Sequence, residues 1–261
     1  MEAWIRLSIF VAVLALMLVW EAKRPKRSGR VNRWHRWRSH LGLIVTSSVL
    51  MRLVVPLGLT GIALWASEHG WGVFNQFELP LWLAVMVSMI ALDLVLYWQH
   101  RLFHRVPWLW RLHRVHHADP DFDVTTGVRF HPIEMILSLA IKAATILILG
   151  VPATAVLIFE IILNACSLFN HGNVQLPTKL EAGVRKVLIT QELHRIHHSS
   201  VKGETNSNYG FSVVWWDWLF GSYTDQSRAG SDNVDIGLRE FREEQRNTPF
   251  WTLLALPFKD K

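Results

Sequence analysis

Long apolar runs occupy much of the first two thirds of this 261-residue chain, and short polar segments separate them. A run of about 20 apolar residues can span a bilayer as a helix. Three runs of about this length or slightly more cover residues 4–20, 41–66 and 81–99. A fourth, over residues 133–169, is too long for one crossing, and the sequence Gly150-Val151-Pro152 predicts that it breaks into a helical hairpin. The pattern predicts an all-α integral membrane protein with four to five transmembrane helices.

The ends of the chain add little beyond this membrane character. The first run has the length of a signal peptide but no basic start and no small-residue cleavage site, so we expect it to stay as an anchor helix. Residues 211–220 are rich in tryptophan and predict an aromatic belt at the membrane interface. Residues 224–247 predict a polar tail, and residues 250–258 a short apolar patch at the surface. We expect a single domain over residues 1–261, with a motif core at about 93–223 and a polar tail at 224–261.

The distribution of charge orients the predicted helices. Residues 21–40 contain eight lysines and arginines, whereas the loop over residues 67–80 contains Glu68 and Glu78 and no basic residue. By the positive-inside rule the basic segment is cytoplasmic and the loop is not. Counting crossings from there brings the histidine-rich segments to the cytoplasmic side. The expectation is a cytoplasmic histidine-rich helical cap, in a bacterial inner membrane or, in a eukaryote, the endoplasmic reticulum.

Eight of the 13 histidines fall into three spaced motifs, and His131 and His171 lie between the second and third motifs. HRLFH, HRVHH and HRIHH place histidines three and four residues apart, so on helices each motif presents its imidazoles on one face. Imidazole is the commonest metal ligand, and one cation accepts about four to six ligands. Two metal ions are therefore favoured. Spacing alone leaves His131 and His171 undecided; the motif histidines are His100, His104, His113, His116, His117, His194, His197 and His198.

For the remaining histidines and for the polar residues within the apolar runs, the sequence gives weaker indications of a functional role. His35 and His40 lie among arginines and predict part of a solvated basic face. Asp93 and Tyr97 continue the face of His100 and His104 along one helix, so Asp93 either supports a histidine or bonds to another helix. Arg52 and Lys142 lie in apolar runs without an identifiable partner.

Other functional classes leave the histidines unexplained. The chain has no H-E-x-x-H, P-loop or dinucleotide-binding glycine motif. His116 and Asp121 fit the H-x-x-x-x-D arrangement of some membrane acyltransferases, in which a carboxylate orients a basic histidine. A non-catalytic metal-binding membrane protein is the other alternative, although a transporter would hold its ligands near mid-bilayer. Cys166 lies in an apolar run and is not expected to bind metal.

The motifs HRLFH, HRVHH, RFHPIE, NHGN, HRIHH, NSNYG and WWDWLFGSY follow in an order that resembles the fatty acid hydroxylase/sterol desaturase superfamily. The resemblance covers about residues 93–223. It implies a membrane-bound non-haem di-iron enzyme that uses dioxygen and two electrons to hydroxylate or desaturate a lipid such as a fatty acyl chain or a sterol. It also implies ten metal ligands, adding two to the motif histidines: His100, His104, His113, His116, His117, His131, His171, His194, His197 and His198.

The implied chemistry sets the expected cofactors and partners. Oxidising an unactivated carbon requires a redox-active metal, so two iron ions are expected, with zinc as a substitute in recombinant protein. The electrons would come from a separate donor protein, a reductase with a ferredoxin or cytochrome b5-like carrier, and no nucleic-acid partner is expected. Substrate, regiochemistry and oligomeric state stay open. Residues expected to support the metals, or alternatively to form turns and helix caps, are Asp93, Tyr97, Asp121, Arg129, Glu134, Asn208 and Tyr209.

Overall fold

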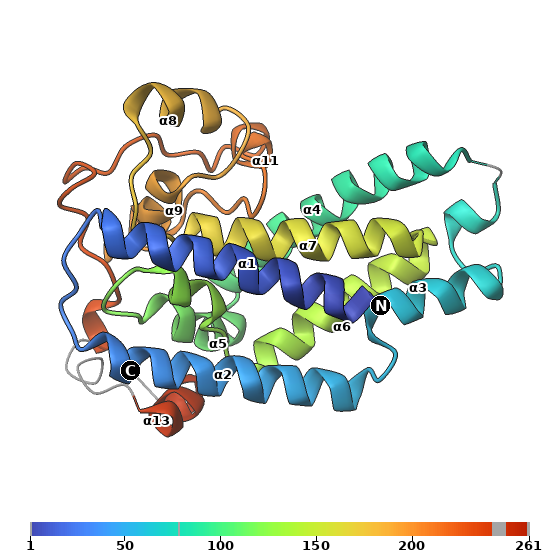
Figure 1. Cartoon of the computed structure of the whole chain (residues 1–261), viewed down its shortest axis with the longest axis horizontal. Helices are drawn as coiled ribbons and strands as arrows, with labels where there is room; N and C mark the ends of the chain where they lie inside the picture. Colours follow the sequence, from blue (N-terminus) through green and yellow to red (C-terminus); the bar gives the residue numbers. More distant parts are fainter. Residues whose placement is uncertain (1, 78, 242–248, 260–261) are drawn as a thin grey trace.

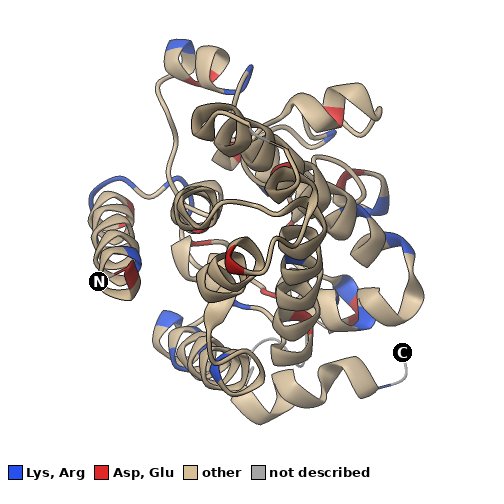
Figure 2. Ribbon diagram, turned by 90° about the vertical axis from the view of Figure 1, so that its right-hand side faces the viewer, with Lys and Arg blue, Asp and Glu red and all other residues tan. Residues whose placement is uncertain are grey.

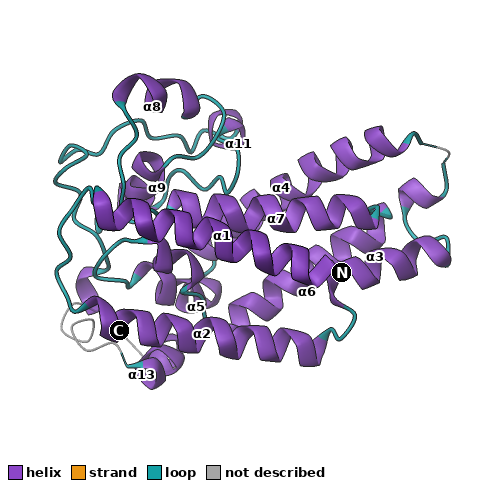
Figure 3. Cartoon of the chain, in the orientation of Figure 1, coloured by secondary structure: helices purple, strands orange, loops and turns teal. Residues whose placement is uncertain are grey.

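The computed structural model describes residues 2–77, 79–241 and 249–259, so Glu78 and part of the predicted tail lie outside the described residues. Helices and connecting loops make up the described chain, which contains two isolated β-bridges and no strand (Figure 3). The predicted all-helical fold class is confirmed. The long helices are α1 (Glu2–Lys23), α2 (Arg33–Val54), α4 (Leu81–Arg105), α6 (Pro132–Leu149) and α7 (Ala153–Asn170), and the shorter α3 (Gly58–Glu68) follows α2 in the same apolar run.

Among the described residues, five segments are long and apolar enough to cross a membrane: α1, the α2–α3 segment, α4, α6 and α7. The second of these differs from the sequence prediction, because the apolar run over residues 41–66 forms two helices and not one. Helix α2 ends at Val54, Pro56 follows, and α3 begins at Gly58. Proline cannot donate the backbone hydrogen bond that would continue α2 and restricts the residue before it, which accounts for the break.

The predicted hairpin between α6 and α7 turns at Gly150. This residue caps α6 in the left-handed conformation, with φ of 71°, and its N–H bonds to the carbonyl of Ile146. A side chain at Gly72 would approach the backbone nitrogen of Gly150 to 2.1 Å. The loop before α4 therefore packs directly on the hairpin, and glycine is required at both contact points.

Packing of the long helices leaves a broad apolar surface. Helices α3, α4, α6 and α7 share a core that includes Leu92, Ile146 and Phe159. Side chains on the outer faces are apolar as well: Leu53 is 71% exposed and Trp82 is 67% exposed. In the end-on view of Figure 2, lysine, arginine, aspartate and glutamate take up only a small part of the ribbon. Such a surface fits contact with lipid.

Short helices gather at one end of the long ones (Figure 1). Part of the C-terminal region packs into this cap: Val234 and Ile236 lie buried against Phe122, and Leu253 is buried in a cluster with Leu43 of α2. The expected surface patch at residues 250–258 is thus partly core. The short elements are α5 (Pro107–His117), η2 (Val124–Val128), α8 (Thr178–Val184), α9 (Gln191–His197), α10 (Lys202–Thr205), α11 (Trp215–Leu219), η3 (Arg239–Phe241), α13 (Phe250–Ala255) and η4 (Leu256–Phe258), with η1 (Val73–Asn75) at the opposite end.

Candidate metal centre

Two helices supply the first five histidines. The last two turns of α4 carry His100 and His104, and α5 begins directly after Val106, with Pro107 in its first turn. Proline is favoured there because its fixed φ suits a helix and its missing N–H is not needed. Helix α5 packs back on α4 and turns His113, His116 and His117 inward, as the three- and four-residue spacing predicts.

The other four histidines come from α7 and α9. His171 is the C-terminal cap of α7, and His194 and His197 lie on α9, with His198 as its C-terminal cap. Thr190 caps the start of α9 by accepting a hydrogen bond from the N–H of Leu193. This cap fixes where the seven-residue helix begins, and therefore which way its histidines point.

The nine histidines form two adjacent groups. Within each group, one ring nitrogen per residue lies within 4.8 Å of those of all other members. The rings of His117 and His198 stack across the boundary, with centroids 4.4 Å apart. Eight of the nine are buried and His104 is half-buried. The first group is His100, His104, His113, His117 and His197, and the second is His116, His171, His194 and His198.

In the first group, three histidines donate a hydrogen bond from Nδ1–H, which leaves their Nε2 atoms free to face inward. The Nδ1–H groups of His100, His113 and His197 donate to the carbonyl of Tyr209 (2.8 Å), the carboxylate of Glu134 (2.6 Å) and the carbonyl of Ser207 (2.7 Å). Their Nε2 atoms are buried with no hydrogen-bond partner. A lone pair facing inward and an N–H held by an acceptor are what a metal-ligating histidine requires.

In the second group the free nitrogens point at one another. His171 donates Nδ1–H to the carbonyl of Ser167 at 2.7 Å, so its Nε2 carries a lone pair. That atom lies 3.1 Å from Nε2 of His116 and 2.9 Å from Nε2 of His194. Three nitrogens converging from three elements fit a cation among them, and the donor set suits iron, zinc, copper or nickel.

Burial keeps these imidazoles in the form that binds metal. It lowers the pKa of His197 to about 3 and that of His171 to about 4. Burial, followed by the repulsion from neighbouring histidines, holds four further pKa values well below their usual range, those of His116, His117, His194 and His198. Neutral rings have a lone pair to donate, so both groups are ready for metal near neutral pH.

His131 is not part of either group, contrary to the resemblance-based prediction. Its Nδ1 accepts the N–H of Ile133 and so caps the start of α6, while its Nε2 lies 3.2 Å from the carbonyl of Leu254. Both ring nitrogens are therefore used, and neither faces the other histidines. Motif order locates a residue in the chain but does not show which way its side chain points.

His40 and Arg36 also differ from the sequence prediction of a solvated basic face, since both are buried. The guanidinium of Arg36 donates two hydrogen bonds to Asp119, at 2.7 and 2.8 Å, and a third to Asp123. His40 bonds to Thr125 at 2.9 Å. Although burial alone would raise it, the pKa of Asp119 is held well below its usual range by Arg36 and Arg129. This network ties α2 to the segment that follows α5.

Two of the predicted supporting residues touch the histidines. Glu134 holds His113, as described above, and its other carboxylate oxygen is buried without a partner. Tyr209 accepts from His100 through its backbone carbonyl, and its ring lies 5.2 Å from that of His104 and 5.8 Å from that of His197. The sequence did not point to Ser207. This residue accepts from His197 through its backbone carbonyl, a group that every residue type has.

The remaining supporting candidates are bonded to other parts of the chain. Asp93 accepts from the indole of Trp216, so its alternative role, a bond to another element, is the one observed. Tyr97 bonds to Ser222 and Arg101.

The other three candidates also bind away from the histidines. Asp121 accepts from the backbone N–H groups of Arg30 and Val31. Arg129 donates to the carbonyl of Val115. Asn208, with φ of 50°, donates to the carbonyls of Leu193 and Thr224. These contacts hold the cap together around the histidines.

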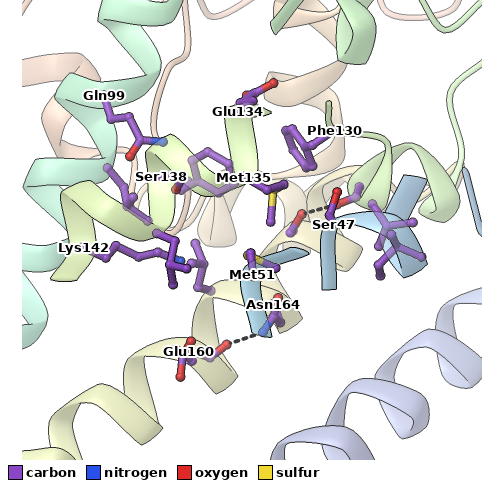
Figure 4. Close-up of a pocket in the computed structure, with 18 of the residues that line it drawn as sticks. Ser47, Met51, Gln99, Phe130, Glu134, Met135, Ser138, Lys142, Glu160 and Asn164 are labelled. Atoms are coloured by element: carbon purple, nitrogen blue, oxygen red, sulfur yellow. Dashed lines mark hydrogen bonds between the residues drawn. The ribbon is translucent and has the colours of Figure 1, made fainter. Parts of the chain in front are cut away.

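A cavity of about 220 Å³ lies between the long helices, and two of the histidines belong to its lining. These are His100 and His113, and Phe103, Phe130 and Phe211 add apolar walls. Figure 4 shows part of this lining. Leu96, Met135 and Leu163 continue this lining between α4, α6 and α7. Its position would allow an elongated apolar molecule to reach the first histidine group from the membrane-spanning part of the chain.

Comparisons with known proteins agree with these motifs. The fatty acid hydroxylase family model matches residues 85–222. The chain is 32% identical to ornithine lipid hydroxylase OlsE of Rhizobium tropici over 157 residues, 60% of this chain and 46% of that protein. It is 24% identical to human alkylglycerol monooxygenase over 204 residues, 74% of this chain and 42% of that protein.

A third relative extends the range of reactions. The Nicotiana tabacum Delta(7)-sterol-C5(6)-desaturase is 25% identical over 202 residues, 72% of this chain and 69% of that protein. The chain spans less than half the length of the first two relatives. No solved structure matches the chain.

Proposed function

Because this chain belongs to the fatty acid hydroxylase family, we propose that it is a membrane-bound non-haem di-iron oxygenase that hydroxylates or desaturates a lipid. The observation that carries the proposal is the pair of buried histidine groups whose free nitrogens converge. The names of the relatives support both reaction types and a lipid substrate. Hydroxylation would consume dioxygen, two electrons and two protons and release one water; desaturation would release two.

Each histidine group would hold one ion. Five histidines would surround the first position and four the second. Iron there would supply the activation of dioxygen and the oxidation of a C–H bond, whereas zinc is redox-inert and would occupy the same imidazoles without supporting the reaction. We expect zinc to compete for these positions in recombinant protein.

The chain's own residues would position and shield the reaction. Glu134 keeps the proton of His113 on Nδ1 and so leaves Nε2 available on the side of the metal. His100 and His113 face the cavity, so the C–H bond to be oxidised would lie beside them. The phenylalanines of the cavity wall exclude water, which favours reaction with substrate over loss of oxidising equivalents to solvent.

Electrons would come from a separate protein. The chain has no sequence motif for flavin, haem or an iron–sulfur cluster, and the basic segment over residues 21–38 lies beside the cap. This segment would attract an acidic electron carrier, anionic lipid headgroups, or both.

An acyltransferase role has less support. It needs Asp121 to orient His116, but the carboxylate of Asp121 accepts backbone N–H groups of the segment before α2, and His116 faces His171. A base without its orienting carboxylate would lose most of its catalytic advantage.

The histidine cap is proposed to face the cytoplasm. The basic residues over 21–38 and the loop before α4, which contains Glu68 and Glu78 but no lysine or arginine, motivate this orientation. Tags inserted at Gly29 and at Gly70 would test it, and we expect protease or label access from the cytoplasmic side only at Gly29. Access to Gly29 from the opposite side would refute the orientation.

Lipid profiling tests the proposed reaction directly. Cells that express the chain should accumulate a lipid whose mass differs by one added oxygen or by two lost hydrogens, and the change should disappear without dioxygen. The His197→Ala variant serves as the matched control, because it removes one ligand from the same protein. An unchanged lipid profile in aerated, iron-replete cells with an active electron donor would contradict the proposal.

A further inference from the structure

The cavity beside the histidines contains charged groups deep within the spanning helices. Lys142 is the eleventh residue of the 18-residue helix α6, and Glu160 is the eighth of the 18-residue helix α7. Both line the cavity (Figure 4). Ionisable residues in the middle of a membrane span are costly and usually mark a functional site.

Two cations, Lys142 and Arg6, share one carboxylate, that of Glu160. Glu160 forms an ion pair with Arg6 of α1, which occupies its negative charge. Glu134 lies eight residues from Lys142 on α6, where it accepts a hydrogen bond from His113 and does not contact Lys142. Among the described residues Lys142 has neither a hydrogen bond nor an ion pair, so its ammonium is the cation that the cavity leaves without a bonded partner.

Other polar atoms around the cavity also lack partners. The hydroxyl of Ser47 and the carbonyl oxygen of the Gln99 side chain are buried without hydrogen bonds, and the second carboxylate oxygen of Glu134 is as well. Ser138 and Asn164 add further polar groups to the lining. A cavity made only for a hydrocarbon chain would not require these groups, because each costs free energy when buried unpaired.

We propose that Lys142 binds an anionic group of the substrate, which enters this cavity with its charged end deep in the membrane and its apolar chain extending toward His100 and His113. The inference rests on the proposed function, since it names how that same site selects its lipid. Lys142 and Glu134 are eight residues apart on α6, about 12 Å along the helix axis. A carboxylate at Lys142 would therefore place the oxidised carbon several bonds away from the charged group.

Equilibrium binding tests the proposal without turnover. The probes are dodecanoic acid, dodecanol and monododecyl phosphate, added to metal-loaded protein in nanodiscs of phosphatidylcholine without reductant. A charge-assisted bond predicts that one or both anions bind about ten- to a hundredfold more tightly than the alcohol. The stronger of the two identifies carboxylate or phosphate as the group that is bound.

Variants assign the preference to one residue. Lys142→Met should remove the preference for the anion, and Lys142→Arg should keep most of it. Arg52→Met is the matched control: Arg52 is exposed near the end of α2 and does not line the cavity, so this variant should bind like the wild type. Metal content measured on every variant shows that the cap is intact.

Three results would overturn the proposal: equal binding of acid, phosphate and alcohol by the wild type, an unchanged preference in Lys142→Met, or an equal loss in Arg52→Met. Failure of the proposed function looks different, because anion binding would persist in a protein that makes no oxidised lipid. Conversely, oxidised lipid without anion preference would leave the proposed function standing and refute only the role of Lys142.

Discussion

Replacing His197 with alanine is expected to abolish formation of oxidised lipid and to lower the metal content of the protein. His197 is fully buried in the first histidine group, and its Nδ1–H donates to the carbonyl of Ser207, which leaves Nε2 to face the group. Loss of residues that merely orient a ligand typically costs 10- to 100-fold in affinity or activity, so loss of a ligand should cost more than about 100-fold. Product formation and metal per chain are measured on the same purified preparation.

Two variants separate ligation from general damage. His131→Ala removes a histidine that caps α6 outside both groups, so it should keep the full metal content at a cost of about 1 kcal/mol in stability. Asp121→Asn should keep partial activity, because its carboxylate bonds to the backbone before α2 and not to a histidine. Full activity in His197→Ala, or metal loss in His131→Ala equal to that in His197→Ala, would contradict the assignment of the ligands.

Replacing Asp119 with alanine is expected to lower the free energy of unfolding more than any other substitution named above. Its carboxylate is completely buried and accepts two hydrogen bonds from Arg36 and one from Thr126. Removing one partner of a buried pair leaves the other charge uncompensated and typically costs 3–5 kcal/mol. In a chain of this size that corresponds to a fall in Tm of roughly 6–20 °C, measured on detergent-purified protein.

The double variant Arg36→Met/Asp119→Leu is the control for this effect. It removes Arg36 together with Asp119 and should be less destabilised than Asp119→Ala, in which the buried guanidinium of Arg36 keeps only Asp123 as an ion-pair partner. Arg129 loses Asp119 in both variants. The pKa of Asp119 in the folded protein is well below that of the free carboxyl, so its stabilisation is present above the unfolded pKa and disappears only as pH falls through the folded pKa. The deficit should therefore be the same at pH 6 and pH 8. A variant Asp119→Ala as stable as wild type would refute the role of the pair.

Local periodicity accounts for what the sequence could predict. Apolar runs marked the spanning segments, and Gly150 with Pro152 marked the hairpin, because each feature depends on neighbours along the chain. The clustered histidines were found for the same reason: spacing on a helix determines a shared face. The break at Pro56 was missed although its signal is also local, because the apolar run over residues 41–66 continues on both sides of the proline.

Contacts between distant segments could not be predicted in this way. The basic neighbours of Arg36 and His40 in the sequence predict that both are exposed to solvent. Both are buried in the structure, and Arg36 bonds to Asp119, which is 83 residues away in the chain. His131 has the motif context of a ligand but points to the carbonyl of Leu254. Lys142 has no local partner in sequence either, and only the packing of α6 against α2 and α4 places it on the cavity.

The number and identity of metal ions per chain test the central claim most directly. Protein purified from iron-replete cells, quantified by elemental analysis together with its chain concentration, should contain about two metal ions per chain, with iron the ion that supports product formation. The same ratio should persist in His131→Ala. A wild-type protein that binds one ion or none per chain after reconstitution with ferrous iron would contradict a centre built from two histidine groups.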